Sequence, residues 1–318
     1  GAVLTRVAAS HLRVGTFQYA AFYGMPEDLR ALADYTLQRH FPEIDPESPT
    51  KYLQLLQRVV ERQIDLVVRW QLVGFVHGVM NTDNVTISGE TIDYGPCAFM
   101  DLYDPEPVFS SIDRDGRYAY GNQPRITAWN LARFADTLLP LIDEDEVKAI
   151  EQAQEVIAAF PDLYRERWLA GMRAKLGLRR REHGDRALAD ELLHLMQSHG
   201  ADFTNTFRAL TIGRTEPTPI YTSAKWMKWY DRWRARAERE GVPLEQVRAR
   251  MREANPAVIP RNHRVEEALA AAVDDADLKP LQQLLAALKD PYAYSSQQEL
   301  YAATPEPSPR PYVTYCGT

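Results

Sequence analysis

The chain has 318 residues, of which 45% are hydrophobic and 25% are charged, a balance typical of a soluble globular protein. Its formal net charge of −7 argues against binding nucleic acid or an anionic membrane surface through bulk charge. No secretory signal opens the sequence, and no apolar run approaches the roughly 18 residues of a membrane span, so we expect a cytoplasmic protein with no membrane or nucleic-acid partner.

The first part of the chain predicts two helices after a short extended segment. The sequence opens with GAVLTRV rather than Met, and we interpret it as a fragment or a processed chain. Residues 3–17 mix β-branched and basic side chains and favour a strand and a turn. Leucines at helical spacing predict a helix over 26–41. A longer apolar period, starting at the Ser48–Pro49 signal, predicts a second helix that ends near residue 75.

Small β elements and then helices are predicted for the rest. Two β-branched runs, Val85–Ser88 and Thr91–Asp93, flank a Gly-Glu turn and predict a hairpin, and residues 101–124 are typical of a loop. Trp226, Trp229 and Trp233 share one helical face and predict a buried aromatic stripe. The basic run RAKLGLRRREHGDR is interpreted as a solvated helix end, with an anion site as the less favoured alternative. Helical periodicity covers the segments 126–142, 144–160, 161–177, 186–198, 222–240, 244–254 and 263–288.

The stretch HGVMNTDNVTISGETIDYG, residues 77–95, gathers acids and an amide in a region poor in other charge. Asn84 lies in its loop and Asp93 at the end of the predicted hairpin, which would bring the two together. An amide oxygen and a carboxylate, completed by waters and phosphates, suit Mg²⁺. For a lone Asp or Asn, turn capping is the commoner role. However, His77, Asn84 and the triplet Asp93-Tyr94-Gly95 have the spacing of the protein-kinase catalytic loop and metal-binding triplet.

One position departs from that spacing. The kinase base would fall two residues after the histidine, where this sequence has Val79, and a valine side chain cannot accept a proton. A different acid, Asp83, directly precedes Asn84. From these residues alone, an inactive kinase-like protein and a transferase with a different base fit equally well.

A longer match extends this pattern. Residues 70–101, WQLVGFVHGVMNTDNVTISGETIDYGPCAFMD, closely resemble the selenoprotein O (SelO) family. GAVLTRVAASHLRVGTFQYAAF near the start, GRYAYGNQPRITAWNLARFA, NPAVIPRNHR and the near-terminal Cys316 match as well, so the resemblance spans nearly the whole chain. It implies a protein-kinase-like fold that transfers AMP from ATP to hydroxyl side chains of proteins, with ATP flipped relative to kinases.

The resemblance also implies roles for single residues. Asp83 matches the catalytic base, and Asn84 and Asp93 match the ligands of Mg²⁺ or Mn²⁺. Arg6 and Arg13 match two arginines that hold the terminal phosphate of the flipped ATP. Cys316 matches a position that is selenocysteine in some members and for which a redox role is suspected, whereas Cys97 is interpreted as a small apolar filler.

The resemblance has a gap at its start, because the family's N-terminal lobe, with its Gly-rich segment and Lys–Glu pair, has no counterpart here. We expect a mainly α protein with small β elements (α+β), a kinase-like C-lobe with a helical C-terminal extension. The expected divisions are a core at 1–142, a helical region at 143–300 packed on it, and a Pro-rich mobile tail at 301–318. Eukaryotic members of the family imply a mitochondrial location for those relatives.

Three functions are compatible with these sequence observations. The first is a protein adenylyltransferase that takes ATP and modifies Ser, Thr or Tyr hydroxyls, and the second is a kinase that transfers the γ-phosphate. The third is a nucleotide-binding pseudokinase or scaffold without activity, which Val79 and the missing lobe favour. We expect the first for the full-length protein and give the third more weight for this chain alone.

Overall fold

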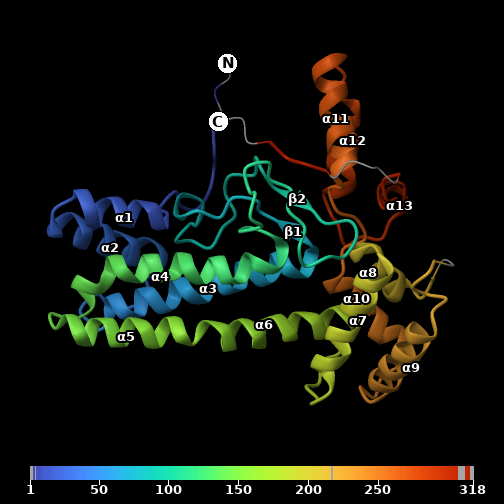
Figure 1. Ribbon diagram of the computed structural model, residues 1–318, viewed down its shortest axis with the longest axis horizontal. Coiled ribbons are helices and arrows are strands. Elements are labelled where there is room, and N and C mark those ends of the chain that lie inside the picture. Colours follow the sequence, from blue (N-terminus) through green and yellow to red (C-terminus); the bar gives the residue numbers. More distant parts are fainter. Residues whose placement is uncertain (1–2, 4, 216–217, 307–311, 316–318) are drawn as a thin grey trace.

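A long central helix, α3 (Lys51–Val73), organises the molecule, whose computed structural model describes residues 3, 5–215, 218–306 and 312–315. Its apolar residues recur every three or four positions, so a broad stripe is buried against α4 (Gln123–Ile142) and α6 (Phe160–Lys175), which run alongside it (Figure 1). The helix ends where Gly74 takes a left-handed φ of 72°. In the described residues the fold is mainly helical with one two-stranded sheet, which confirms the predicted class.

Two short helices, α1 (Val14–Tyr23) and α2 (Pro26–His40), lie together at one end of the molecule (Figure 1). α2 agrees with the sequence prediction. α1 does not, because residues from Val14 onward had favoured a strand and a turn. Its Phe17 ring packs edge-on against Phe134 of α4, with 4.9 Å between ring centroids, and this tertiary packing outweighs the β propensity.

The sheet consists of β1 (Phe75–Val76) and β2 (Ala98–Phe99), which are antiparallel. The outer edge of β2 is covered by Asn262, whose side chain accepts a hydrogen bond from Phe99 N at 3.1 Å and donates one to Phe99 O at 2.9 Å. A side chain from far along the chain thus pairs with β2 as a third strand would.

The predicted hairpin at 85–93 is wrong. The Thr86 hydroxyl donates to Glu90 O and accepts from Glu90 N, at 2.7 and 2.9 Å, and so takes the backbone groups that a ladder would use. The first arm of the predicted hairpin bonds to the start of the chain instead. Val14 N donates to Val85 O and Ile87 N donates to Leu12 O, each at 2.9 Å.

The C-terminal half is helical, as predicted, with two helices that the sequence did not reveal and one predicted helix that is divided. Residues 263–288 form two helices: Ala276 has a φ of 52° between them, and the Asp277 carboxylate accepts a hydrogen bond from the N–H of Lys279, the first residue of the second helix. The stripe of Trp226, Trp229 and Trp233 is buried, as predicted. The helices are α5 (Glu146–Ala158), α7 (Asp185–His199), α8 (Phe203–Ile212), α9 (Ala224–Glu238), α10 (Leu244–Ala254), α11 (Asn262–Asp274), α12 (Lys279–Leu288) and α13 (Ser296–Tyr301), of which α8 and α13 were missed.

The buried core does not divide at residue 142. One apolar cluster contains buried residues of α1, α2, α3 and α4, together with Ala149 of α5 and Phe160 of α6. A second joins the later helices to Val76 of β1 and Met100 after β2. None of the helices in the described part of the chain is long and apolar enough to cross a membrane.

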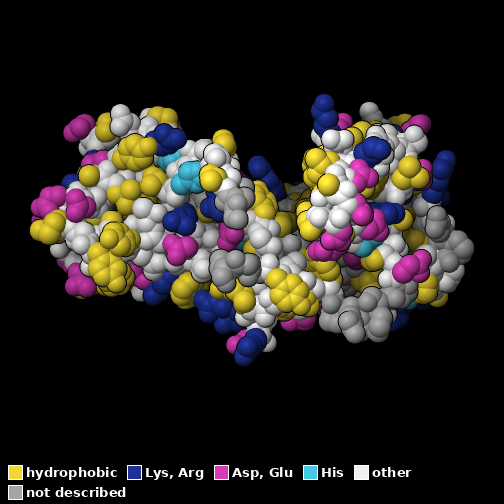
Figure 2. Space-filling view, turned by 90° about the horizontal axis from the view of Figure 1, so that it is seen from above, with side chains coloured by type: hydrophobic (Ala, Val, Ile, Leu, Met, Phe, Trp, Pro, Cys, Tyr) yellow, Lys and Arg dark blue, Asp and Glu magenta, His cyan; other side chains and the backbone are white. Residues whose placement is uncertain are grey.

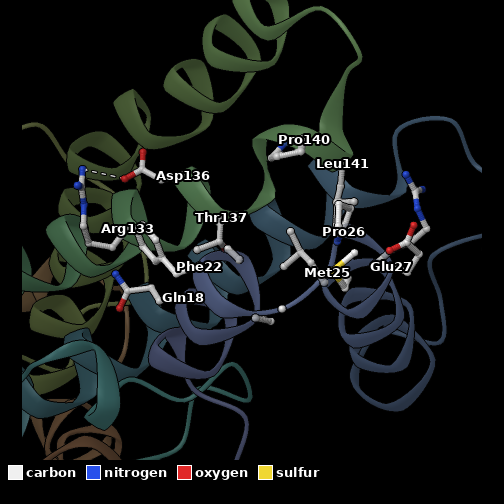
Figure 3. Close-up of a pocket in the computed structure, with 15 residues that line it drawn as sticks. Gln18, Phe22, Met25, Pro26, Glu27, Arg133, Asp136, Thr137, Pro140 and Leu141 are labelled. Atoms are coloured by element: carbon white, nitrogen blue, oxygen red, sulfur yellow. Dashed lines mark ion pairs between the residues drawn. The ribbon is translucent and has the colours of Figure 1, made fainter.

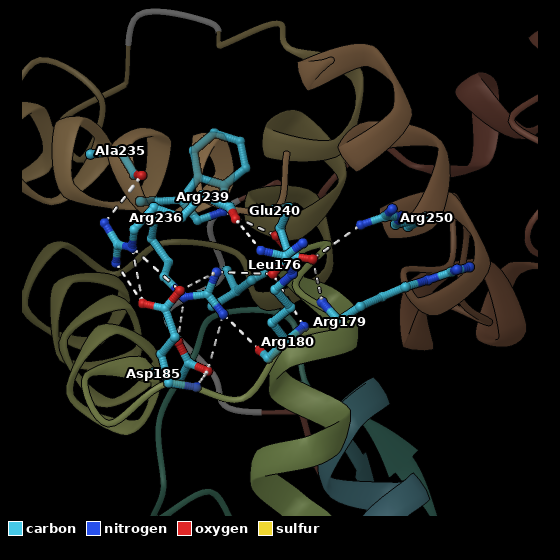
Figure 4. Close-up of polar contacts among 11 residues, drawn as sticks. Leu176, Arg179, Arg180, Asp185, Ala235, Arg236, Arg239, Glu240 and Arg250 are labelled. Carbon is cyan, nitrogen blue, oxygen red and sulfur yellow. Dashed lines mark hydrogen bonds and ion pairs between the residues drawn. The ribbon is translucent and has the colours of Figure 1, made fainter. Parts of the chain in front are cut away.

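A buried ionic cluster holds the connection between α6 and α7, where the basic run lies (Figure 4). The Arg236 side chain is 4% exposed and pairs with Asp185 at 2.7 Å and Glu240 at 2.9 Å, both of which are buried. Glu240 also accepts from the backbone N–H groups of Arg179 and Arg180. The basic side chains from Arg179 to Arg186 are exposed, as expected, whereas Lys175 near the start of the run is buried. The backbone at Arg179 and Arg180 is held by the buried carboxylate of Glu240.

The described part of the tail, which was expected to be mobile, contacts the core. Thr314 is buried, its N–H donates to Phe109 O at 2.7 Å, and its hydroxyl donates to Pro96 O at 2.8 Å. Cys316 lies outside the described residues.

Candidate active site

The two loops that carry the predicted site are joined by a buried histidine. His77 follows β1, and its Nε2 lies 2.7 Å from the carbonyl oxygen of Ile92, the residue before Asp93. A carbonyl can only accept, so Nε2 is protonated, and Nδ1 accepts from Val79 N at 3.4 Å. Burial lowers the pKa of His77, which favours this neutral form. His77 therefore fixes the loop of Asp83 relative to the loop of Asp93.

Asn84 and Asp93 are brought into direct contact, with 2.8 Å between Asn84 Nδ2 and Asp93 Oδ2. Asn84 Nδ2 also donates to Val79 O at 3.0 Å, which leaves the Oδ1 atom of each side chain unused within this pair. Asp93 has a φ of 60°, in the left-handed region that non-glycine residues adopt rarely, although Asp and Asn adopt it more readily than most. One amide oxygen and one carboxylate are a donor set that fits Mg²⁺ completed by phosphates and water. The described residues contain no cluster of three or more His, Cys, Asp or Glu side chains suited to a metal.

Asp83 lies in a short 3-10 turn, η1 (Thr82–Asn84), whose start is capped by the Asn81 side chain. Its carboxylate is exposed and lies against Gly15 in the first turn of α1, so closely that a Cβ atom at Gly15 would overlap Oδ1. Arg13 Nη1 donates to the Asp83 carbonyl oxygen at 3.2 Å. These residues share an open hollow of about 580 Å³.

Arg6, the second predicted phosphate ligand, is not brought to this hollow. Its side chain is exposed and makes no hydrogen bond or ion pair with the rest of the described chain. Its backbone oxygen lies 3.2 Å from Nε2 of His11. Of the two predicted arginines, only Arg13 is held beside Asp83.

Comparison with known proteins identifies the family of the chain. Residues 1–289 match the sequence profile described as "Protein adenylyltransferase SelO". The chain belongs to the SelO family. Among curated SelO-family relatives, proteins named "Protein nucleotidyltransferase YdiU" are 63% identical in Geobacillus kaustophilus, 60% in Shouchella clausii and 58% in Brevibacillus brevis. Each match covers all of this chain but only 65–66% of the relative's length.

Three site residues in this member of the SelO family were missed by sequence reasoning. Gln123, at the start of α4, accepts from His77 N and donates to Phe75 O, both at 2.9 Å, and Asn130 donates to Met80 O at 2.9 Å. Together they anchor the loop between β1 and Asp83. Both belong to GNQPRITAWN, a segment that resembles the SelO family, so that match was an available signal. Gly15 also lies in a segment that resembles the SelO family, GAVLTRVAASHLRVGTFQYAAF, but its contact with Asp83, 68 positions away, was not predicted from the sequence.

Cys97 lies two residues after the Asp93-Tyr94-Gly95 triplet and is half-buried among apolar side chains, in line with a filler role. Burial raises the pKa of its thiol to about 11, which suppresses thiolate chemistry at neutral pH.

A second hollow, of about 520 Å³, lies between α1, α2 and α4 (Figure 3). Gln18 and Phe22 line both hollows, whereas Asp83, Asn84 and Asp93 do not line this one. Hydrophobic side chains gather over this end of the molecule (Figure 2), and the large exposed ones are Tyr19, Phe22, Tyr23 and Met25. This hollow combines apolar side chains with Glu27 and the Arg133–Asp136 ion pair, and none of the predicted site residues lines it.

Proposed function

We propose that the chain forms the metal-binding and base-bearing part of a protein adenylyltransferase, the C-lobe of a kinase-like fold. The contact between Asn84 and Asp93 carries this proposal, because the residues expected to share a divalent cation meet beside an exposed carboxylate. The chain spans about 65% of its curated relatives, so ATP, the acceptor proteins and the activity of the whole protein are all part of the proposal.

In the proposed reaction, Asp83 accepts the proton of a Ser, Thr or Tyr hydroxyl on an acceptor protein. The hydroxyl oxygen forms a bond to the α-phosphorus of ATP, and the bond between that phosphorus and the bridging oxygen breaks, releasing pyrophosphate. The open hollow around Asp83 supports access by a side chain of another protein. A positioned base contributes roughly 10²- to 10⁴-fold to such a step.

Asn84 and Asp93 would hold Mg²⁺ or Mn²⁺, which supplies charge stabilisation for the phosphate oxygens when bound. His77 keeps the two loops in register so that the base and the metal ligands stay together. Arg13 offers a planar guanidinium suited to phosphate oxygens, and Arg6 would have to move toward the nucleotide to share this role.

The test compares ATP labelled at the α-phosphate with ATP labelled at the γ-phosphate. It uses this chain and a chimera that adds the third of the Geobacillus relative that the chain does not match. We expect transfer of α-label by the chimera, a loss of about 10²-fold or more in Asp83→Asn, and near-normal ATP binding in that variant. Asp93→Asn should remove divalent-dependent ATP binding, and Arg6→Ala with Arg13→Ala should weaken binding itself.

The matched control is Asp274→Asn, which makes the same change at an exposed acid at the end of α11. Transfer of γ-label that is lost in Asp83→Asn would establish a kinase instead. Nucleotide binding by the chimera with no transfer of either label would support a non-catalytic protein.

A further inference from the structure

A separate cavity of about 420 Å³ is lined by residues of α3, β1, β2, α6 and α10 and by Thr91 and Tyr94, which flank the predicted metal ligand Asp93 in the chain. Its walls are mainly apolar and include Leu72 and Val73 of α3 and Phe75 and Phe99 of the sheet. Tyr94, the neighbour of Asp93, forms part of its rim. A cavity of this size and character is typical of small-molecule sites.

The charged groups that line this cavity are all positive. Arg69 and Lys175 line it, and no aspartate or glutamate does. The Arg69 guanidinium is exposed and makes no ion pair with any described residue. The cavity is therefore complementary to an anion, although the protein as a whole carries a net charge of −7.

Lys175 is a buried cation without a counter-charge. It is 1% exposed, and its ammonium has no hydrogen-bond acceptor in the described chain. The nearest favourable groups are aromatic faces, with Nζ 4.0 Å from the ring centroid of Phe207 and 5.3 Å from that of Phe203. Cation–π contacts offset only part of the cost of burying an ammonium group. In agreement, burial alone lowers the pKa of Lys175 to about 7.

We propose that this cavity binds a small apolar carboxylate, whose body packs on the apolar walls and whose carboxylate is bound by Lys175, with Arg69 at the solvent side. The proposal commits to an organic acid with an aliphatic or aromatic body, because the walls offer few hydrogen-bonding groups for a sugar or a nucleotide. The bound molecule would contact Tyr94 and so lie one residue from Asp93. This site is independent of the proposed transferase activity.

The experiment measures binding of decanoate by calorimetry below its micelle concentration, with 1-decanol as the uncharged molecule of the same length. We expect decanoate to bind at least about tenfold more tightly than decanol, the effect of one charge-assisted hydrogen bond. Lys175→Met keeps the length of the buried side chain and should abolish this preference, while Arg69→Gln should reduce it less. Lys225→Met, at an exposed site away from the cavity, should leave it unchanged.

A second variant tests the location without touching the charge. Ala174 lines the cavity from an exposed position on α6, so Ala174→Trp should fill the space, preserve the fold and weaken both probes. Equal binding of decanoate and decanol, no binding of decanoate, or a preference that survives in Lys175→Met would each overturn the proposal. Unchanged binding in Ala174→Trp would do the same, because the site would then lie elsewhere.

Discussion

Gly15 determines how closely α1 can approach the proposed base. A side chain at this position would overlap the Asp83 carboxylate, whereas a helix normally gains about 1 kcal/mol when glycine is replaced by alanine. Gly15→Ala should therefore leave the melting temperature close to normal or slightly higher, while AMP transfer by the chimera falls at least about tenfold because Asp83 is displaced.

Gly184→Ala is the matched control for this prediction, since nothing lies within 4 Å of a Cβ atom there. Transfer rates and thermal melting of the two variants separate a displaced base from a general loss of fold. Full activity in Gly15→Ala would show that the Asp83 carboxylate does not need its observed position.

Lys175 makes stability depend on pH in a defined window. Its pKa is 10.5 in an ordinary environment and about 7 in the folded protein. Between these values the unfolded chain binds a proton that the folded chain does not, so the free energy of unfolding rises with pH from about 7 to 10.5 and is flat below. The full difference corresponds to roughly 5 kcal/mol.

Lys175→Met removes this dependence. At pH 7 the variant should be several kcal/mol more stable than the parent, and the gain should shrink toward zero as pH approaches 10. Urea unfolding of both proteins at pH 7 and pH 10 measures it. A stability difference that is the same at both pH values would contradict a buried lysine of lowered pKa.

At the scale of elements, the connection between α6 and α7 depends on one buried guanidinium. Removing one partner of a buried ion pair typically costs about 3–5 kcal/mol, because the remaining charges are left without compensation. Arg236→Met should cause a loss of this size, since Asp185 and Glu240 stay buried, and urea unfolding will measure it. Arg232→Met breaks an exposed pair with Glu191 and should cost less than about 1 kcal/mol. Equal effects of the two substitutions would show that burial does not set the strength of this cluster.

At the scale of the whole molecule, sequence periodicity located most helices because their burial depends on neighbours three or four positions apart. α3 is the clearest case, with an apolar stripe along its whole length. At Val14–Tyr23, the packing of Phe17 on Phe134 of α4 outweighs local propensity. At the predicted hairpin, Val85 and Ile87 bond to the start of the chain and the Thr86 hydroxyl takes the backbone groups of Glu90, and strand propensity predicts neither contact.

The same distinction holds within the site. The spacing of His77, Asn84 and Asp93 follows a known pattern. In the structure Asn84 contacts Asp93 directly, and His77 contacts the backbone of Ile92, the residue before Asp93. Gln123 and Gly15 support this arrangement from distant segments, so no spacing rule could single them out. Whether Asp83 acts as a base, and whether Asn84 and Asp93 bind a metal, remain predictions.

The side chain of Asn262 has a consequence for solubility. An exposed edge of a sheet is a template for pairing with another chain, and proteins commonly cover or interrupt such edges. The Asn262 side chain bonds to both the N–H and the C=O of Phe99, so these backbone groups at the free edge of β2 are already occupied. Because the partner is a side chain, it does not present a new strand edge to a neighbouring molecule. The amide thus protects the two-stranded sheet from intermolecular β-pairing and aggregation, and ties that protection to the folding of the C-terminal helices.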